Sequence, residues 1–341
     1  MRFDDIWVAG TGATLGDPVP VSGAVAAGAY SAEAAASTGM ISYSQSTQAP
    51  PEMAVSSGRQ AIKAAAEHAV EIGPTSLHLH SHAGFQGIDQ WSAACWIAGE
   101  LIGTQLDTMP ITVAAWSNGS IASLEVAANA LTANPALPSA LITVADRFGP
   151  PGDRFHTSPG MVFGDGAAAA VLTRGGGRFR LLSCVAEADT VLGGLARGDE
   201  PFRLSPSPEP ADSRRRTREF LAQGEVSLRD IQTRTTQRVR SVVSRALDEA
   251  QVSPDQVDWM VTPFVGRTLY HNSFVRPLDF TPRNTLLEFG LTIGHLGAAD
   301  QILGLHHLAG SDLLEPGSRI LLIGTGMGFT FSAAVLTAGD D

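Results

Sequence analysis

The chain has 341 residues, of which 44% are hydrophobic and 17% are charged, so it can bury one large core or two fused ones. We expect neither a membrane span nor a secretion signal, and hence a cytoplasmic location, because no run of about eighteen apolar residues occurs and the start, MRFDDIWVAG, lacks a basic segment followed by an apolar one. The formal net charge of -11 argues against nucleic acid as a partner, and the two cysteines stand in no metal-ligand spacing, which predicts neither a disulfide framework nor a metal site.

Residues 1–45 include YSAEAAASTGMISYSQST, which predicts a loop and short helices rather than a separate domain. Residues 56–82 have the pattern of an amphipathic helix, a Gly-Pro turn and an alternating strand. His78, His80 and His82 alternate along that strand and share one face, which in principle could bind zinc. No carboxylate or cysteine accompanies them at short spacing, so structural or interface histidines are the favoured interpretation.

Ser117 stands where an apolar strand turns into a helix of small and apolar residues, within ITVAAWSNGSIASLEVAANAL. A side chain at such a junction meets unpaired backbone N–H groups and the positive end of the helix dipole, which favour a nucleophile and an oxyanion. The alternative is that Ser117 only caps the helix. Trp91, Trp96 and Trp116 are expected in the core or in a pocket wall, and Trp116 adjoins the serine.

The second half of the sequence repeats the first in order, type and local sequence. The corresponding segments are 56–82 with 240–264, 111–131 with 292–310, 137–146 with 317–326, and 163–173 with 328–337. The second of these pairs brings His295 to the position equivalent to Ser117, and the last pair shares AAVLT. We therefore expect two duplicated halves, 1–180 and 181–341, each with a mostly parallel or mixed sheet covered by helices.

The sequence between the halves is the weakest candidate for a core. EPFRLSPSPEPADSRRRTREF, residues 200–220, combines four prolines and a run of arginines with few apolar residues. We expect a surface insertion near 199–220. Its arginines either form a solvated face or contact the phosphates of a coenzyme or an acidic carrier protein.

These features together resemble the thiolase superfamily, in particular ketosynthase III. The resemblance depends on the duplicated halves, on the junctions at Ser117 and His295, on FGDGAAAAVL at 163–172 and on GTGMGFTFSAAVL at 324–336. It implies an α/β thiolase fold, in which the two halves form a five-layered α-β-α-β-α architecture, and a homodimer. SAACWIAGELIG at 92–103 is similar to the segment at the dimer interface of this family.

The departures from the family pattern concern the reacting groups. Ketosynthases of this family have cysteine at the position of Ser117, and a histidine and an asparagine that stabilise the enolate in a decarboxylating condensation. Here Pro263 falls at or next to the histidine position, and His295 falls at the asparagine position. The chain cannot use the usual pair. Cys95 lies away from the nucleophile junction and is interpreted as a packing cysteine.

The chain can instead assemble Ser117, His295 and Asp300. Serine is barely ionised near neutral pH and needs an adjacent base, while a carboxylate would fix the tautomer of the imidazole. Residues five apart on one helix point about 140° away from each other, so a contact requires His295 to lie just before the helix. The alternatives are a hydrogen-bonded core histidine and a surface or capping aspartate.

This pattern resembles the ketosynthase III-like acyltransferases of polyketide tailoring and the serine-containing starter-unit enzymes. The resemblance implies an oxyanion hole made by the backbone amides of Ser117 and Met327. We predict an acyltransferase that moves a short acyl group from acyl-CoA or an acyl carrier protein through an acyl-serine, with Trp116 at the acyl site and no metal or redox cofactor. Two alternatives stay open: a starter-unit ketosynthase III acting on a malonyl carrier protein, and a catalytically silent partner of a condensing enzyme.

Overall fold

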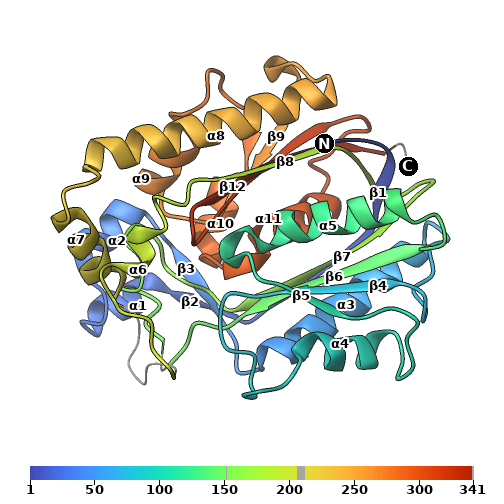
Figure 1. Cartoon of the computed structure of the whole chain (residues 1–341), viewed down its shortest axis with the longest axis horizontal. Coiled ribbons are helices and arrows are strands. Elements are labelled where there is room, and N and C mark those ends of the chain that lie inside the picture. The colour runs from blue at the N-terminus through green and yellow to red at the C-terminus, as the bar shows by residue number, and fades with distance from the viewer. Residues whose placement is uncertain (151, 206–211, 340–341) are drawn as a thin grey trace.

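The computed structural model of the chain describes residues 1–150, 152–205 and 212–339 (Figure 1). Its centre is a ten-stranded sheet in the order β10-β9-β11-β12-β8-β1-β7-β6-β4-β5, and β2 pairs with β3 in a small separate sheet. The strands are β1 Arg2–Leu15, β2 Asp17–Pro20, β3 Ser42–Gln45, β4 Leu77–Ser81, β5 Ile111–Val113, β6 Ser139–Asp146, β7 Gly166–Thr173, β8 Phe179–Ala188, β9 Trp259–Val261, β10 Asn284–Thr285, β11 Arg319–Gly326 and β12 Thr330–Ala338.

Helices connect these strands and cover the sheet. The α-helices are α1 Val21–Ala26, α2 Ala32–Thr38, α3 Pro50–Ala66, α4 Ala93–Leu101, α5 Gly119–Ala133, α6 Gly194–Arg197, α7 Ser213–Ala222, α8 Leu228–Ala250, α9 Arg267–Tyr270, α10 Leu287–Ile293 and α11 Asp300–Ala309. Short turns of other helix types are η1 Trp116–Asn118, η2 Pro254–Gln256, η3 His271–Val275 and η4 Gly297–Ala299. Within the described ranges, no helix combines the length and the apolar character needed to cross a membrane.

Each half of the chain contributes five strands to the sheet in the same pattern. In the first half, β5, β4 and β6 are parallel to one another, and β7 and β1 follow in antiparallel pairing. In the second half, β10, β9 and β11 are parallel, and β12 and β8 follow in antiparallel pairing. The antiparallel pair β1 and β8 joins the two sets into one continuous sheet.

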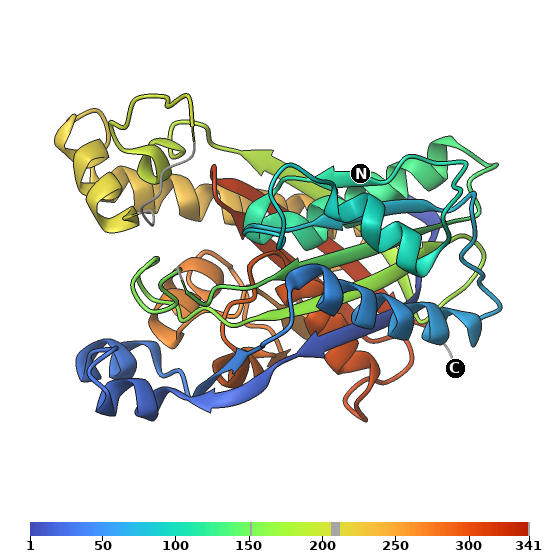
Figure 2. The ribbon, with the colours of Figure 1, turned by 90° about the horizontal axis from the view of Figure 1, so that it is seen from below.

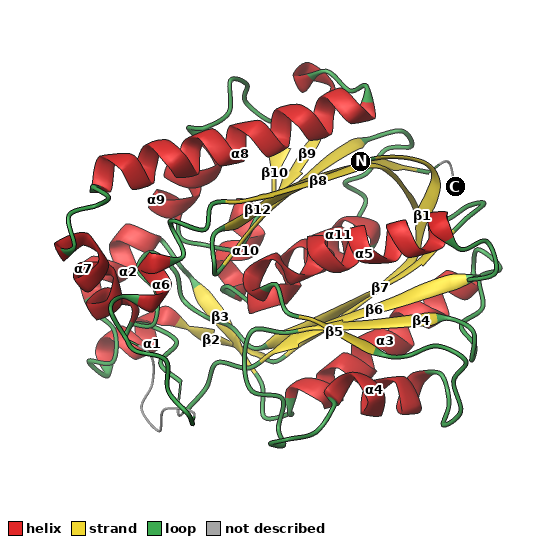
Figure 3. Ribbon diagram, viewed as in Figure 1, coloured by secondary structure: helices red, strands yellow, loops and turns green. Residues whose placement is uncertain are grey.

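The sheet folds so that α5 and α11 lie between its two halves (Figures 1 and 3). Ile121 and Leu124 of α5 and Ile302 and Leu305 of α11 are fully buried in one core with side chains of both sets of strands. Outside, α3 packs on β1, β6 and β7, and α8 packs on β8 and β12. Strand β7 is buried at every position because helices cover both faces of the sheet. The five-layered α-β-α-β-α architecture predicted from the sequence is confirmed.

Two groups of elements extend beyond these layers at one end of the molecule (Figure 2). One consists of β2, β3, α1 and α2, and the other of α6, α7 and the start of α8. Within YSAEAAASTGMISYSQST, the expected short helix forms as α2, whereas the strand β3 was not expected. The long strand β1 precedes this segment and forms because β7 and β8 pair with its two edges.

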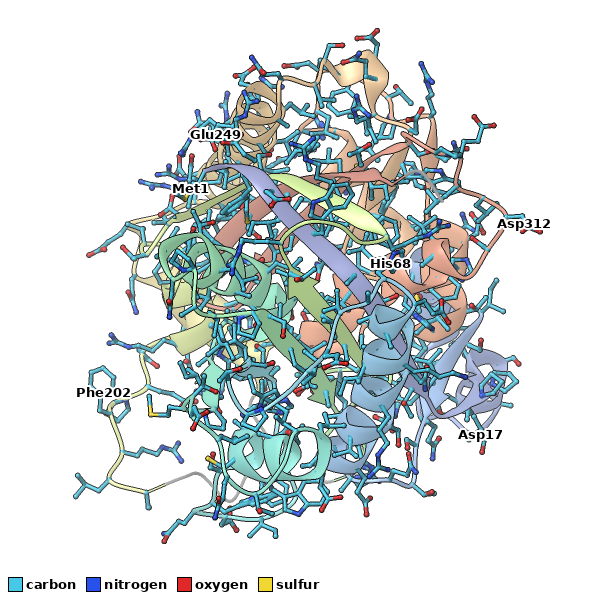
Figure 4. The ribbon with its side chains drawn as sticks, turned by 90° about the vertical axis from the view of Figure 1, so that its right-hand side faces the viewer. Met1, Asp17, His68, Phe202, Glu249 and Asp312 are labelled. Atoms are coloured by element: carbon cyan, nitrogen blue, oxygen red, sulfur yellow. The ribbon has the colours of Figure 1, made fainter. Side chains whose placement is uncertain are left out.

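The insertion expected near 199–220 includes residues 206–211, which lie outside the described residues. Its second part forms α7, and Phe220 on this helix is buried in the core beneath α8. Arg215 and Arg216 both bind Glu200, so these two members of the arginine run are paired within the chain. Phe202, by contrast, is 94% exposed and stands away from the body of the protein (Figure 4).

Candidate active site

Ser117 lies in η1, the single turn that joins the end of β5 to α5. The turn begins at Trp116, whose φ of 51° is in the left-handed region that side chains other than glycine rarely adopt. The N-cap residue of α5 is Asn118, and the Ser117 hydroxyl bonds to His295 instead of the helix backbone. The capping interpretation of Ser117 is therefore excluded.

Three side chains form one hydrogen-bonded series. Ser117 Oγ lies 2.8 Å from His295 Nε2, and His295 Nδ1 lies 2.6 Å from Asp300 Oδ2. His295 and Asp300 are buried. The Asp300 carboxylate also accepts hydrogen bonds from the amide of Phe264 at 2.7 Å and from the amide of Leu296 at 2.8 Å. Because a carboxylate only accepts, Nδ1 carries the proton in the neutral ring and Nε2 is free to accept one from the serine.

His295 is held by its backbone against the FGDG segment. Its N–H donates to Val162 O at 2.8 Å, and its carbonyl accepts from the Gly164 N–H at 3.0 Å. The ring of Phe163 lies against the imidazole, with 5.3 Å between the ring centroids. A Cβ at Gly164 would overlap the carbonyl of Ile293, so this close approach requires glycine. The motif thus fixes the histidine ahead of η4, and Asp300 begins α11 beyond that turn.

The structure corrects the equivalence drawn between Ser117 and His295. Gly297 starts η4 with a φ of 64°, as Trp116 starts η1 with a φ of 51°, so the two turns match residue by residue from these positions. Ala298 is therefore the counterpart of Ser117. The sequence comparison was shifted because it matched the small-residue helices and not the left-handed residue that begins each turn.

Asp146, which the sequence analysis did not single out, is fully buried beside this site. It ends β6 and accepts hydrogen bonds from the amides of Ala83 at 2.8 Å, Gly84 at 2.7 Å and Ala298 at 3.1 Å. Burial raises the pKa of Asp146 to about 6, against the opposing effect of these three amides. Its carboxylate links the pocket wall at Ala83 to the turn between His295 and the start of α11. In the sequence, the feature that could have pointed to Asp146 is a single carboxylate at the end of an apolar strand.

A second buried acid holds the FGDG segment in place. Asp165 pairs with Arg154, with 3.0 Å between Oδ2 and Nη2, and also accepts from the amides of Ser46 and Phe148. Removing one partner of such a pair would leave a buried charge uncompensated. The aspartate of this motif is therefore structural, and it is one step removed from His295.

Ser117 and His295 line a cavity of about 370 Å³. Its walls are largely apolar and aromatic, from Phe148, Met161, Phe163, Leu269, Phe274, Phe329 and Phe331. Trp116 lines the cavity and is 44% exposed, and Pro263 lies in the wall where no titratable group replaces the missing histidine. Met327 also lines it, from the tip of the hairpin between β11 and β12. Such a cavity fits an apolar acyl group next to a nucleophile.

The other residues that the sequence singled out lie apart from this site. His78 and His80 both contact the hydroxyl of Thr143, at 3.0 Å and 2.9 Å. Burial lowers the pKa of His78 to about 4 and that of His80 to about 3, so both are neutral structural histidines. No group of three or more metal-ligating side chains is assembled in the described part of the chain. Cys95 is exposed on α4, contrary to its interpretation as a packing residue.

Comparisons with known proteins agree with this fold. The family model described as the C-terminal part of 3-oxoacyl-[acyl-carrier-protein] synthase III matches residues 247–338, and the model for 3-oxoacyl-[acyl-carrier-protein] synthase III matches residues 112–190. Beta-ketoacyl-[acyl-carrier-protein] synthase III 5 from Streptomyces coelicolor is 26% identical over 294 residues, which cover 84% of this chain and 82% of that protein.

Solved structures extend the similarity to the whole chain. The acyltransferase ChlB3 superposes with a TM-score of 0.90 and 31% identity, over 98% of both chains. The 3-oxoacyl-(acyl carrier protein) synthase III FabH from Pseudomonas aeruginosa PAO1 shares the fold, with a TM-score of 0.75 and 19% identity over 99% of both chains. The fold and the site define a thiolase-fold protein with a hydrogen-bonded serine, histidine and aspartate between its two halves. The chain belongs to the ketosynthase III-like family of the thiolase superfamily, whose members transfer or condense acyl groups.

Proposed function

We propose that the protein is an acyltransferase of polyketide or related natural-product biosynthesis that moves a short acyl group through an acyl ester of Ser117. The hydrogen-bonded series from Ser117 through His295 to Asp300, at 2.8 Å and 2.6 Å, carries this proposal. A serine with a positioned base in an apolar cavity is the arrangement that acyl transfer requires. The similarity to an acyltransferase over 98% of both chains supports it.

In the proposed first step, Ser117 Oγ attacks the thioester carbonyl of acyl-CoA or of an acyl carrier protein. His295 Nε2 takes the serine proton, and Asp300 stabilises the imidazolium and keeps it in place. The amides of Ser117 and Met327 would bind the oxyanion of the tetrahedral intermediate. When the intermediate collapses, the C–S bond breaks and His295 returns the proton to the thiolate, which leaves as the free thiol.

In the proposed second step, His295 removes a proton from a hydroxyl or amine acceptor, whose oxygen or nitrogen attacks the acyl ester. The C–O bond to Ser117 breaks, and the serine recovers its proton from His295. No group outside the described triad and backbone amides is required for either step. A backbone donor works with any side chain except proline, so methionine at 327 is compatible with this role.

Condensation with a malonyl carrier protein is the second candidate, and the similarity to the beta-ketoacyl-[acyl-carrier-protein] synthase III 5 of Streptomyces coelicolor favours it. It shares the first step. Pro263 in the cavity wall argues against it, because proline cannot donate a hydrogen bond to the enolate that decarboxylation forms. A silent partner subunit is disfavoured, because the serine is in contact with a base and that base with a carboxylate.

The proposal is tested by incubating the protein with a series of acyl-CoA and acyl carrier protein donors and measuring intact mass. We expect a single acyl adduct on Ser117, discharged by hydroxyl or amine acceptors. Ser117→Cys should acylate at least as fast, because a thiolate depends less on a base. Carbon dioxide release from malonyl carrier protein that depends on His295, without transfer to any hydroxyl or amine, would replace this function with condensation.

We also propose a homodimer that forms along the edge of the sheet. Strand β5 is the last strand on this side, and its edge is a template for pairing with another strand. Large apolar side chains are exposed around it and on the neighbouring α4, namely Phe85, Ile88, Trp96, Met109 and Ile111. Light scattering after size exclusion should give twice the chain mass, and Ile111→Lys should shift the protein to a monomer.

A further inference from the structure

Asn118, the residue after Ser117, connects the nucleophile turn to the hairpin that carries Met327. Its carboxamide nitrogen donates to Thr330 Oγ1 at 3.2 Å, and its oxygen accepts a hydrogen bond from the Ser332 hydroxyl. The side chain is 3% exposed, so neither bond competes with bulk water. Both partners belong to β12 in the second half of the chain, whereas Asn118 belongs to the first.

Two glycines of β11 complete this contact. Gly324 pairs with Ser332 and Gly326 with Thr330 across the hairpin, and alternate residues of a strand share one face. A Cβ at Gly324 would overlap the carboxamide oxygen of Asn118, and a Cβ at Gly326 would come within 2.9 Å of the Asn118 Cβ. The hairpin therefore lies on the asparagine with no room for a side chain between them.

We propose that Asn118 is the positioning residue of the oxyanion hole, because it sets the separation between the amides of Ser117 and Met327. This rests on the proposed function, in which these two amides bind one oxygen. Ser117 is covalently next to Asn118, and Met327 follows Gly326 at the tip of the hairpin. Oxyanion donors act only when both lie about 2.7–3.1 Å from the same oxygen position. Two hydrogen bonds to β12 and the close contacts with β11 fix the hairpin against the turn that carries Ser117.

The experiment compares Asn118→Ala with the wild type for two ligands. One is a boronic acid that forms a tetrahedral adduct with Ser117, and the other is an acyl-CoA analogue with a methylene in place of the thioester carbonyl. In the variant, we expect the maximal rate of self-acylation and the affinity for the boronic acid to fall about 10- to 100-fold, since loss of a whole oxyanion donor costs about 10²- to 10³-fold. Affinity for the methylene analogue should stay within about threefold, because that ligand forms no oxyanion.

Two further variants separate positioning from folding. Ser332→Ala removes one hydroxyl from the hairpin and should shift the same two readouts in the same direction, and its effect should not add to that of Asn118→Ala in the double variant. It carries the comparison if Asn118→Ala does not fold. Ser123→Ala, which removes a buried hydroxyl from α5 one turn beyond the site, should match the wild type for both ligands.

An equal loss of affinity for both ligands, or unchanged acylation in Asn118→Ala, would overturn the positioning role and leave the acyl-serine mechanism intact. A wild-type protein that forms no acyl-serine with any donor would instead overturn the proposed function, and the positioning role with it. The two failures are therefore distinguishable in the same set of measurements.

Discussion

The turn before α5 and the turn before α11 have the same backbone and different chemistry. Each begins with a left-handed residue, continues as a short turn of 3-10 helix and leads into a helix buried between the two halves of the sheet. In the first half the middle residue is Ser117, whereas in the second it is Ala298. The second half places its two members of the hydrogen-bonded series on either side of the turn instead, with His295 before it and Asp300 after it.

The difference shows how the two halves of a duplicated fold can each supply part of one proposed catalytic site. The start of α5 touches the second turn directly, because Ser120 Oγ donates to the carbonyl of Ala298 at 2.5 Å and a Cβ at Gly119 would come within 2.8 Å of the Ala298 Cβ. The proposed nucleophile comes from one half and its base from the other, so the site is complete only when both halves have packed.

Removing the nucleophile should have the largest effect. Ser117→Ala is expected to abolish covalent acylation, because Ala298 already shows that the same turn forms around alanine. The free energy of unfolding should change by no more than about 1 kcal/mol, since the lost hydroxyl makes a single hydrogen bond, to His295. Intact mass measures the adduct and chemical denaturation measures stability. An undiminished adduct in Ser117→Ala would remove this residue from the mechanism.

Removing the base and its partner should rank next. His295→Ala should slow acylation by about 10³-fold or more, because an unassisted serine is a poor nucleophile. Asp300→Asn should cost less but still about 10²-fold or more, since the amide cannot accept from Nδ1 and from the Phe264 and Leu296 amides as the carboxylate does. The rates of self-acylation are measured at saturating acyl-CoA by quenching the reaction at set times and recording the intact mass. Wild-type rates in both variants would mean that Ser117, if reactive, has another base.

The fold could be predicted because the second half of the sequence repeats the segments of the first half in the same order. Strands covered on both faces are runs of small and apolar residues, as in β7 and β12, and the shared AAVLT marks their equivalence. The register of the two turns could not be predicted in the same way. Glycine at 297 signals a left-handed residue, but its counterpart is Trp116, which carries no such signal.

The three side chains of the hydrogen-bonded series were found from residue type and resemblance, whereas the groups that support them were not. Asp146 binds backbone amides at residues 83, 84 and 298, and no side-chain pattern records such contacts. The role of Asn118 could not be predicted from the sequence either, because its partners Ser332 and Thr330 are more than 200 residues away along the chain. Support by backbone groups and by distant hydroxyls appears only when the two halves are packed together.

The second turn is bonded through its Ala298 amide to the buried carboxylate of Asp146, and this contact is measurable as a pH dependence. Asp146 has a folded-state pKa of about 6 against an ordinary value of 3.8, so the folded protein binds its proton more tightly. The stabilisation from this proton is full below about pH 3.8 and is lost as pH rises through about 6. Relative to Asp146→Asn, the wild-type free energy of unfolding should therefore fall by about 3 kcal/mol over this range, at 1.36 kcal/mol per pKa unit.

Urea denaturation of both proteins between pH 4 and 7 measures this difference, since groups unaffected by the substitution cancel. A difference that does not vary with pH would mean that the pKa of Asp146 is the same in the folded and the unfolded protein. The opposite slope, with the wild type gaining stability as pH rises, would mean that the amides of Ala83, Gly84 and Ala298 outweigh burial.

The smallest effect concerns the residue that begins each turn. Trp116 occupies a backbone conformation that Gly297 adopts without strain, and its half-exposed indole has limited packing to lose. Trp116→Gly and Trp116→Ala both remove the indole, but only glycine relieves the left-handed strain. We expect the glycine variant to be more stable than the alanine variant by about 1 kcal/mol, which is the reverse of their order inside a regular helix.

Both variants should acylate within about tenfold of the wild type if Trp116 only forms a wall of the acyl site. Denaturation and self-acylation rates measure the two effects. If the alanine variant were as stable as the glycine variant, the backbone at residue 116 would have left the left-handed region once the indole was removed. The similar φ values of residues 116 and 297 would then depend on the tryptophan side chain.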